Sequence, residues 1–289
     1  LVAGFQGVST AGDDVTTLGR GGSDTTAVAV AAAVGADVCE IYTDVRGVFS
    51  ADPRIVPDAR KLPLLSFEEM LEIAASGARV LQLRSVEYAR SHGVRIHCRS
   101  SFDDAPGTVV VSEEETVEKP LITAVVHSSE EARITLLGVP DRPGVAGEIF
   151  TALAAANVNV DMIVQNEPAS DGARAEISLT VPREDLMASR AALEPMQGEL
   201  FATLASDPDM GKVSVIGAGM KTHPGVAAKV FSTLGEGGIN IEMTVTSPIK
   251  ITCVIRRDKV PEAVRSLHAA FGLGAVGVEP EDPFGREAA

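Results

Sequence analysis

The sequence predicts an α/β layer fold over residues 1–112, followed by two small ferredoxin-like α+β domains over residues 121–207 and 208–289. Three observations support this prediction. Helix and strand patterns alternate in the first part, a charged stretch that ends in a proline follows at residues 113–120, and the remainder contains an internal repeat. With 289 residues, 45% of them hydrophobic, the chain can bury a sizeable core.

The formal net charge of −15 argues against nucleic acid and anionic membranes as partners, because both need a basic face. Cys39, Cys98 and Cys253 are far apart and have no metal-ligand spacing, so we expect free thiols in a cytoplasmic protein. The most apolar run, residues 25–36, is too short to cross a bilayer, and the N-terminal residues lack the basic region of a signal peptide. Because Leu1 already lies within a strand pattern, we expect the chain to be a piece of a longer one.

The elements of the first part follow from apolar runs and capping signals. Residues 38–45 predict a buried strand with Thr43 and Asp44 at its C-terminal end, where ligands bind in open α/β sheets. Ser66 and Glu69 form a capping-box pattern that begins a helix ending at Gly77. The other expectations are strands at 1–8 and 94–101, loops at 9–22 and 46–60, and helices at 24–36 and 79–91.

The stretch TTLGRGGSDTTA, residues 16–27, permits two interpretations. It is a turn in which Ser23 or Asp24 caps the following helix, or it is an anion site made from Gly21, Gly22 and the positive end of that helix. Glycines allow the main chain to approach an anion closely, and Arg20 adds a planar, bidentate donor. The stretch alone does not decide between them.

The second part contains a duplicated unit. Residues 140–164 and 221–245 align at a fixed offset of 81 with nine identical pairs, among them Pro143/Pro224, Gly144/Gly225 and Asn159/Asn240. Each copy has a strand, a Pro-Gly turn, a helix and two further strands, which predicts a split β-α-β fold. The expected strands are 132–139, 157–165 and 174–182 in the first unit and 212–219, 238–247 and 250–257 in the second. Val145, Ile149 and Leu153 share one helix face, and residues 121–129 form an additional strand of the first or the second unit.

The motifs GRGGSD, VCEIYTDVRGVFSADPR and SFEEMLEIAASGARVL, followed by PDRPGVA and THPGVA turns, resemble aspartate kinase of the actinobacterial type. The resemblance covers essentially the whole chain. It implies the C-terminal part of an amino-acid-kinase α/β sandwich over residues 1–112 and two ACT domains behind it.

The resemblance also implies an activity. Aspartate kinases phosphorylate L-aspartate to 4-phospho-L-aspartate with ATP and Mg²⁺, the first step toward lysine, threonine and methionine. Lysine, threonine or both then regulate the enzyme through the ACT domains, which also form homodimers or hetero-oligomers. No metal ligand is identified in this sequence.

Site residues carry over from the family by position. Arg20, Gly21, Gly22 and Ser23 are expected at the aspartate, with Arg20 and Asp24 catalytic. The expected nucleotide contacts are Thr43, Asp44, Phe49, Asp52, Arg54 and Arg79. Phe49 replaces a family tyrosine and Arg79 a family lysine. The expected effector contacts are Asp141, Gly144, Val145, Ala146, Asn159, Asp161 and Gln165 in the first unit, and Lys221, His223, Gly225, Val226, Asn240, Ile241 and Glu242 in the second.

The lysine-glycine motif with which the family begins does not occur in this sequence, so we expect no kinase activity from this chain alone. A non-catalytic module that senses amino acids is the alternative. Another amino-acid kinase, such as a glutamate kinase, is disfavoured by the tandem ACT units.

Overall fold

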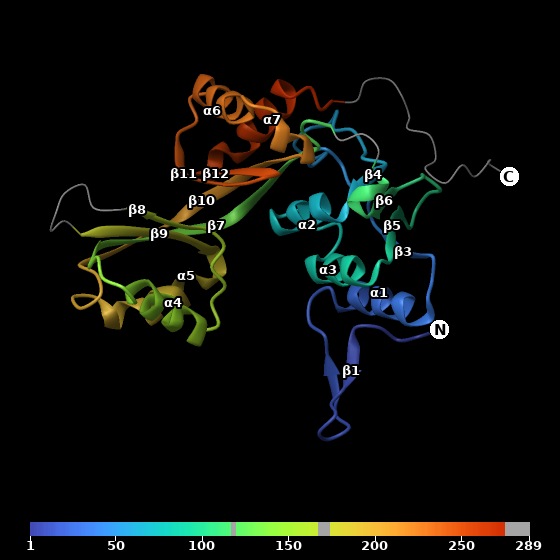
Figure 1. Cartoon of the computed structure of the whole chain (residues 1–289), viewed down its shortest axis with the longest axis horizontal. Helices are drawn as coiled ribbons and strands as arrows, with labels where there is room; N and C mark the ends of the chain where they lie inside the picture. Colours follow the sequence, from blue (N-terminus) through green and yellow to red (C-terminus); the bar gives the residue numbers. More distant parts are fainter. Residues whose placement is uncertain (117–119, 167–173, 275–289) are drawn as a thin grey trace.

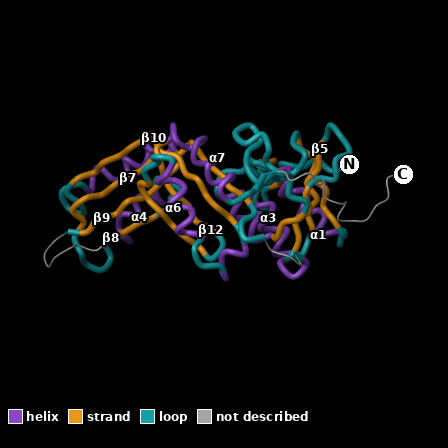
Figure 2. Tube along the Cα trace, turned by 90° about the horizontal axis from the view of Figure 1, so that it is seen from above, coloured by secondary structure: helices purple, strands orange, loops and turns teal. Residues whose placement is uncertain are grey.

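The computed structural model describes residues 1–116, 120–166 and 174–274. Two β-sheets lie side by side, and a hairpin extends from the first part of the chain (Figure 1). Seen from above, the larger sheet and the smaller one occupy opposite halves of an elongated molecule (Figure 2). In the described part of the chain, no helix has the combined length and apolar character that a membrane span requires.

The first part is an α/β layer built on a four-stranded sheet of order β3-β5-β6-β4. β3 and β5 are parallel, as expected for an open α/β sheet. The strands are β3 (Val38–Thr43), β4 (Leu64–Ser66), β5 (Arg95–Ser100) and β6 (Thr108–Val111); the helices are α1 (Gly22–Val34), α2 (Phe67–Ala75) and α3 (Leu83–His92). The three helices and the strands β3 and β5 were predicted, and the short strands β4 and β6 were not.

The N-terminal prediction was wrong. Residues 1–8 were expected to be one strand and 9–22 a loop, but β1 (Gln6–Val8) pairs antiparallel with β2 (Val15–Thr17). This hairpin projects away from both sheets (Figure 1). Val8 and Val15 are largely exposed, so hairpin hydrogen bonds rather than core burial hold the strands.

The second part is a six-stranded antiparallel sheet of order β11-β12-β10-β7-β9-β8. Its central strands are β7 (Ala124–Val139) and β10 (Thr203–Ile216), and the others are β8 (Ile163–Asn166), β9 (Ala175–Pro182), β11 (Ile241–Ser247) and β12 (Lys250–Arg256). The segments 121–129 and 132–139, predicted as separate strands, are continuous in β7. Residues 124–128 of β7 pair with 212–216 of β10, whereas 133–137 pair with 203–207.

The helices of the two repeat units cover opposite faces of this sheet. Figure 1 shows α4 (Val145–Ala155) and α5 (Leu186–Leu193) below it, and α6 (Val226–Glu236) and α7 (Val260–Ala270) above it. Val145, Ile149 and Leu153 of α4 are buried in one core, as the spacing predicted. Their counterparts 81 residues later, Val226, Val230 and Leu234 of α6, are buried in the other.

The two parts of the chain share cores. Ala124, Val126 and Ile216 of the large sheet pack in one cluster with Met70 and Ile73 of α2. The loop that follows β3 contributes Ala51, Val56 and Ala59 to the core beneath α6 and α7. A short 3₁₀ helix, Glu113–Glu115, lies within the stretch predicted as a linker, of which residues 117–119 fall outside the described residues.

The duplicated cores predict equal losses of stability. Leu153→Ala and Leu234→Ala are each expected to lower the free energy of unfolding by about 2–5 kcal/mol, because each leaves a cavity in a dry core. Denaturant unfolding followed by circular dichroism measures this. Met187→Ala, a change at an exposed side chain of α5, is the control and stays within about 0.5 kcal/mol. If only one of the two leucine variants loses stability, the two units do not have equivalent cores.

Candidate functional site

The glycine-rich loop ends at an uncapped helix. The N-cap of α1 is Gly21, with φ 73° in the left-handed region, and no side chain accepts a hydrogen bond at this cap. Ser23 and Asp24 lie inside the first turn, so neither caps the helix as the turn interpretation required. A Cβ on Gly21 would lie 2.1 Å from Gln82 Cγ, so glycine is needed both for φ and for space. The Gly22 N–H donates to the Gly19 carbonyl oxygen at 3.0 Å, so an anion at this helix end would meet the N–H groups of Ser23 and Asp24.

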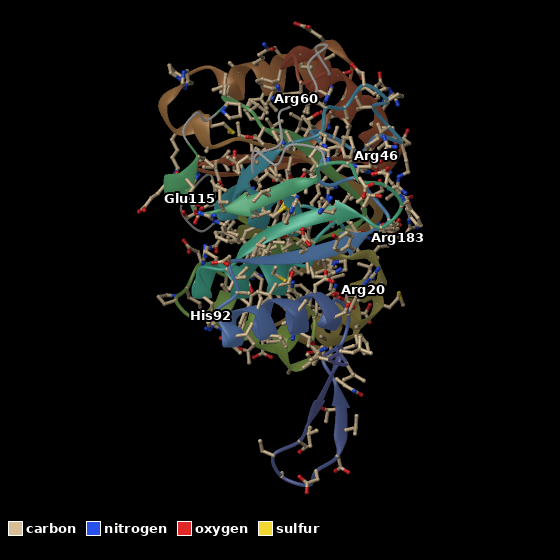
Figure 3. All side chains as sticks on the ribbon, turned by 90° about the vertical axis from the view of Figure 1, so that its right-hand side faces the viewer. Arg20, Arg46, Arg60, His92, Glu115 and Arg183 are labelled. Atoms are coloured by element: carbon tan, nitrogen blue, oxygen red, sulfur yellow. The ribbon has the colours of Figure 1, made fainter. Side chains whose placement is uncertain are left out.

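Two charged side chains surround this helix end. Asp24 is partly buried, and burial raises the pKa of its carboxyl group, while the Gln82 backbone N–H and Ser23 act in the opposite direction. Arg20 is exposed and lies where the hairpin meets the start of α1 (Figure 3). Ser23 is also exposed, whereas Gly22 is buried against Leu18. The loop thus combines a cation, a carboxylate and open helix N–H groups.

A cavity of about 710 Å³ opens beyond the C-terminal end of β3, a volume typical of small-ligand pockets. Five of the six predicted nucleotide contacts line it, namely Asp44, Phe49, Asp52, Arg54 and Arg79. The sixth, Thr43, is not among the lining residues but donates a hydrogen bond to Asp44 Oδ1 at 3.0 Å. Arg20 and Asp24 do not line this cavity.

Within the cavity wall, Arg54 donates two hydrogen bonds to Asp52, from Nε to Oδ1 at 3.0 Å and from Nη2 to Oδ2 at 2.7 Å. These hydrogen bonds lower the pKa of Asp52 and keep it ionised. Arg79 is exposed. The loop between β3 and β4 therefore presents an ion pair rather than two independent charges.

The opposite wall of the cavity was not predicted. It comes from β7, including His127, Ser128 and Glu130. Burial lowers the pKa of His127, so its imidazole is neutral at neutral pH. Gly77, at φ 119°, brings the end of α2 against this strand, because a Cβ there would lie 2.5 Å from the His127 carbonyl oxygen. The only sequence signal was the apolar run before His127, which indicated a strand but not its neighbours.

The two Pro-Gly turns have the same geometry. Gly144 and Gly225 are the N-caps of α4 and α6, with φ 98° and 96°, and no side chain accepts a hydrogen bond at either cap. Of the other predicted effector residues, Val145 and Val226 are buried, Ala146 and Ile241 are half-buried, and Asp141, Asn159, Gln165, Lys221, His223 and Asn240 are exposed. His223 Nδ1 lies 2.9 Å from the Gly219 carbonyl oxygen.

Two of the three predicted effector carboxylates, Asp161 and Glu242, occupy equivalent places in the repeat, and each is paired with the other unit. Lys212 of β10 binds Asp161 Oδ2 at 2.5 Å, and Arg133 of β7 binds Glu242 Oε2 at 2.7 Å. Lys212 also binds Glu131 at 3.1 Å in a nearly fully buried pair. Burial alone would lower the pKa of Lys212, but the two carboxylates outweigh it and raise that pKa. An ammonium ligand at Asp161 would thus compete with Lys212.

Comparison with known proteins identifies the family. Residues 1–100 match the model of the amino acid kinase family, and residues 134–195 and 213–271 match that of the ACT domain. The chain is 48% identical over 278 residues to the aspartokinase of Pseudomonas aeruginosa, across 95% of this chain and 67% of that protein. The chain belongs to the aspartokinase family. It is 54% identical over 277 residues to the aspartokinase of Mycobacterium tuberculosis and spans 66% of that protein's length.

Solved aspartokinases share the fold. E. coli aspartokinase III, crystallised with aspartate and ADP, matches with a TM-score of 0.78 and 28% identity over 92% of this chain and 59% of that chain. The aspartate kinase of Clostridium acetobutylicum matches with a TM-score of 0.80 and 27% identity over 93% of this chain and 62% of that chain. The predicted fold class, part of an amino-acid-kinase sandwich followed by tandem ACT domains, is confirmed.

Aspartokinase chemistry implies Mg²⁺ bound with the nucleotide. Among the residues that the structure describes, no group of three or more His, Cys, Asp or Glu side chains could enclose a metal ion. Mg²⁺ carried by phosphates needs a smaller protein site, often one or two carboxylates. Asp24, a half-buried carboxylate in the first turn of α1, is of the ligand type that such a site uses.

The buried charges around Lys212 lead to a stability prediction. Lys212→Ala is expected to lower the free energy of unfolding by about 3–5 kcal/mol, because it leaves the Glu131 carboxylate buried without its cation. Urea unfolding measures the change. Arg257→Ala, which removes the partner of the exposed Glu130, is the control and costs at most about 1 kcal/mol. Equal losses in the two variants would contradict the special role of Lys212.

Proposed function

We propose that this chain carries the nucleotide side and the regulatory part of an aspartate kinase. The reaction is transfer of the ATP γ-phosphoryl group to the β-carboxylate of L-aspartate, which gives 4-phospho-L-aspartate and ADP. The observation that carries the proposal is the 710 Å³ cavity in which five predicted nucleotide contacts meet. This is the first step of lysine, threonine and methionine synthesis, and we assign it to the cytoplasm.

The chain's own groups suit this chemistry. Arg20 would hold a carboxylate through its planar guanidinium, and the open N-terminus of α1 would attract the same negative charge. Asp24 would orient the reacting groups and hold Mg²⁺, which neutralises charge on the phosphates when it is bound. Asp44 and Phe49 would meet the nucleotide in the cavity. Phosphoryl transfer depends mainly on such positioning and charge.

The tandem ACT domains support regulation by an amino acid. Each unit has a helix N-terminus without a side-chain cap, suited to a carboxylate, and an acid at the equivalent position of the repeat, Asp161 or Glu242, suited to an ammonium group. E. coli aspartokinase III has been crystallised with lysine and aspartate, and its structure matches with a TM-score of 0.73. We infer that L-lysine, L-threonine or both bind here. The edge strands β8 and β11 would pair with another ACT sheet in a homodimer or hetero-oligomer.

The alternative is a non-catalytic amino-acid sensor, which the same ACT features also favour. A coupled assay of ADP release separates the two functions. It is applied to this chain and to the product of the whole open reading frame that contains it. If neither preparation shows aspartate-dependent turnover, the proposed kinase function is rejected.

Arg20 provides the mutational test of the kinase. Arg20→Ala is expected to lower kcat/KM in the active preparation by an amount equivalent to ~2–4 kcal/mol, because a charged contact to a carboxylate or phosphate is lost. Arg183→Ala, at a half-buried arginine of the first ACT unit, is the matched control and leaves kcat/KM unchanged (Figure 3). An unchanged kcat/KM in Arg20→Ala would mean that the loop is only structural.

Effector binding is expected to raise the melting temperature by mass action. Melting is recorded with threonine, with lysine and with both, for the wild type and for Asp141→Ala. We expect Asp141→Ala to reduce the shift, because this exposed carboxylate would contact the effector's ammonium group. If the melting temperature of Asp141→Ala rises as much as that of the wild type, effector binding is supported but Asp141 is rejected as a contact. No shift with either amino acid would reject effector binding.

A further inference from the structure

Ser50 lies in the loop between β3 and β4, next to Phe49 and two residues before Asp52, both of which line the cavity. Unlike these neighbours, Ser50 is fully buried and faces away from the cavity lining. Its backbone carbonyl accepts a hydrogen bond of 2.8 Å from the Val125 N–H of β7. The loop is therefore tied to the large sheet at this residue.

The Ser50 hydroxyl has three hydrogen-bond partners. Oγ accepts from the Arg60 N–H at 3.0 Å and donates to the Leu273 carbonyl oxygen at 3.1 Å. The third partner is His268 Nε2, at 3.0 Å. Because the hydroxyl has one proton, used on Leu273, His268 Nε2 must carry a proton and donate. The group is then saturated, with two bonds accepted and one donated.

His268 is a buried residue near the end of α7, in the second ACT unit. Burial lowers the pKa of its imidazole, while Asp58 raises that pKa and Arg60 lowers it. The ring is therefore neutral at neutral pH, which agrees with a single donor at Nε2.

The apolar side of the same loop also belongs to the second ACT unit. Ala51, Val56 and Ala59 pack in the core that contains Val264 and Leu267 of α7. Ala59 forms an isolated β-bridge with Gly274, after the end of α7. The loop thus contributes both to the cavity lining and to the core of the second ACT unit, and Ala51 belongs to both.

We infer that His268 is a positioning residue of the nucleotide site: through Ser50 Oγ, it holds the loop so that Phe49 and Asp52 face the nucleotide. The inference rests on the proposed nucleotide-binding function of the cavity. His268 itself does not line the cavity, so it acts through Ser50. The second ACT unit thereby supplies a hydrogen bond on which the geometry of the nucleotide site depends.

The test separates nucleotide binding from aspartate binding and from stability. In the active preparation, His268→Leu is expected to raise the KM for ATP about tenfold, the scale of one lost hydrogen bond in a buried site, and to leave the KM for aspartate within about twofold. His268→Gln, whose amide nitrogen can replace Nε2, is expected to restore most of the ATP affinity. Ser50→Ala is expected to behave like His268→Leu, and Ser50→Thr like the wild type.

Ser189→Ala is the matched control, because Ser189 is a fully buried serine of the first ACT unit whose Oγ donates to the Asp185 carbonyl oxygen at 2.7 Å and which does not line the cavity. Calorimetric titration with ADP gives a second measure of affinity, and circular dichroism checks folding. If His268→Leu does not fold, Ser50→Ala compared with Ser50→Thr decides the question.

The outcomes are distinguishable. If the wild type neither turns over nor binds ADP, the proposed function fails. If the wild type is active and His268→Leu and Ser50→Ala keep wild-type affinities for ATP and ADP, only the positioning role is rejected. Equal rises in both KM values, or a rise in Ser189→Ala as well, would also overturn it by showing a general loss of structure.

Discussion

The hydrogen-bond ladders along β7 are the constraint on which the rest of the structure depends. Residues 124–128 of this strand complete the sheet of the second ACT unit, and residues 131–139 form the first strand of the first unit. The same strand forms a wall of the cavity and leads directly into the turn before α4. A shift of its register by one residue would turn Ala124 and Val126 away from α2 and toward the core beneath α6 and α7, where Val125 now packs. The two cores and the cavity wall therefore have to form in the same register.

The repeat is preserved in the fold and in its charges. Positions 161 and 242, which correspond at the offset of 81, each bind a basic residue on a central strand that begins the other unit. The two units are thus joined reciprocally as well as through shared strands. The helices of the two units lie on opposite faces of the sheet, so the two helix N-termini also lie on opposite faces (Figure 1). In both Pro-Gly turns the glycine has a left-handed backbone conformation, which no other residue type adopts as readily.

Local signals were sufficient for much of this fold. The spacing of Val145, Ile149 and Leu153 identified the buried face of α4, and Ser66 with Glu69 identified the start of α2, where both halves of the capping box form. β4 and β6 were missed because strands of three or four residues carry little periodicity. The continuity of β7 was missed because Ser128 to Glu131 look like a break, and only pairing with a distant strand shows otherwise.

The residues of the candidate site also fall into two groups, those that a local motif predicted and those that it did not. Asp44, Phe49, Asp52, Arg54 and Arg79 were found as matches to motifs, and the structure brings them into one cavity. His127, Lys212 and the Ser50–His268 contact were not found, because each depends on residues far apart in the sequence. His268, one of the partners of Ser50, lies 218 residues away in the sequence. Such contacts have no local pattern.

The loop between β3 and β4 has a consequence for how this protein can be divided. A cut at residues 113–120 separates the kinase sequence from the ACT sequences, but it leaves Ala51, Val56 and Ala59 on one side and the core that they fill on the other. A chimera that exchanges regulatory halves between relatives at this point would join a loop of one parent to a core of another. The unit of exchange is therefore discontinuous, and it includes residues 49–59 together with the second ACT unit. Modularity in this chain follows packing rather than sequence order.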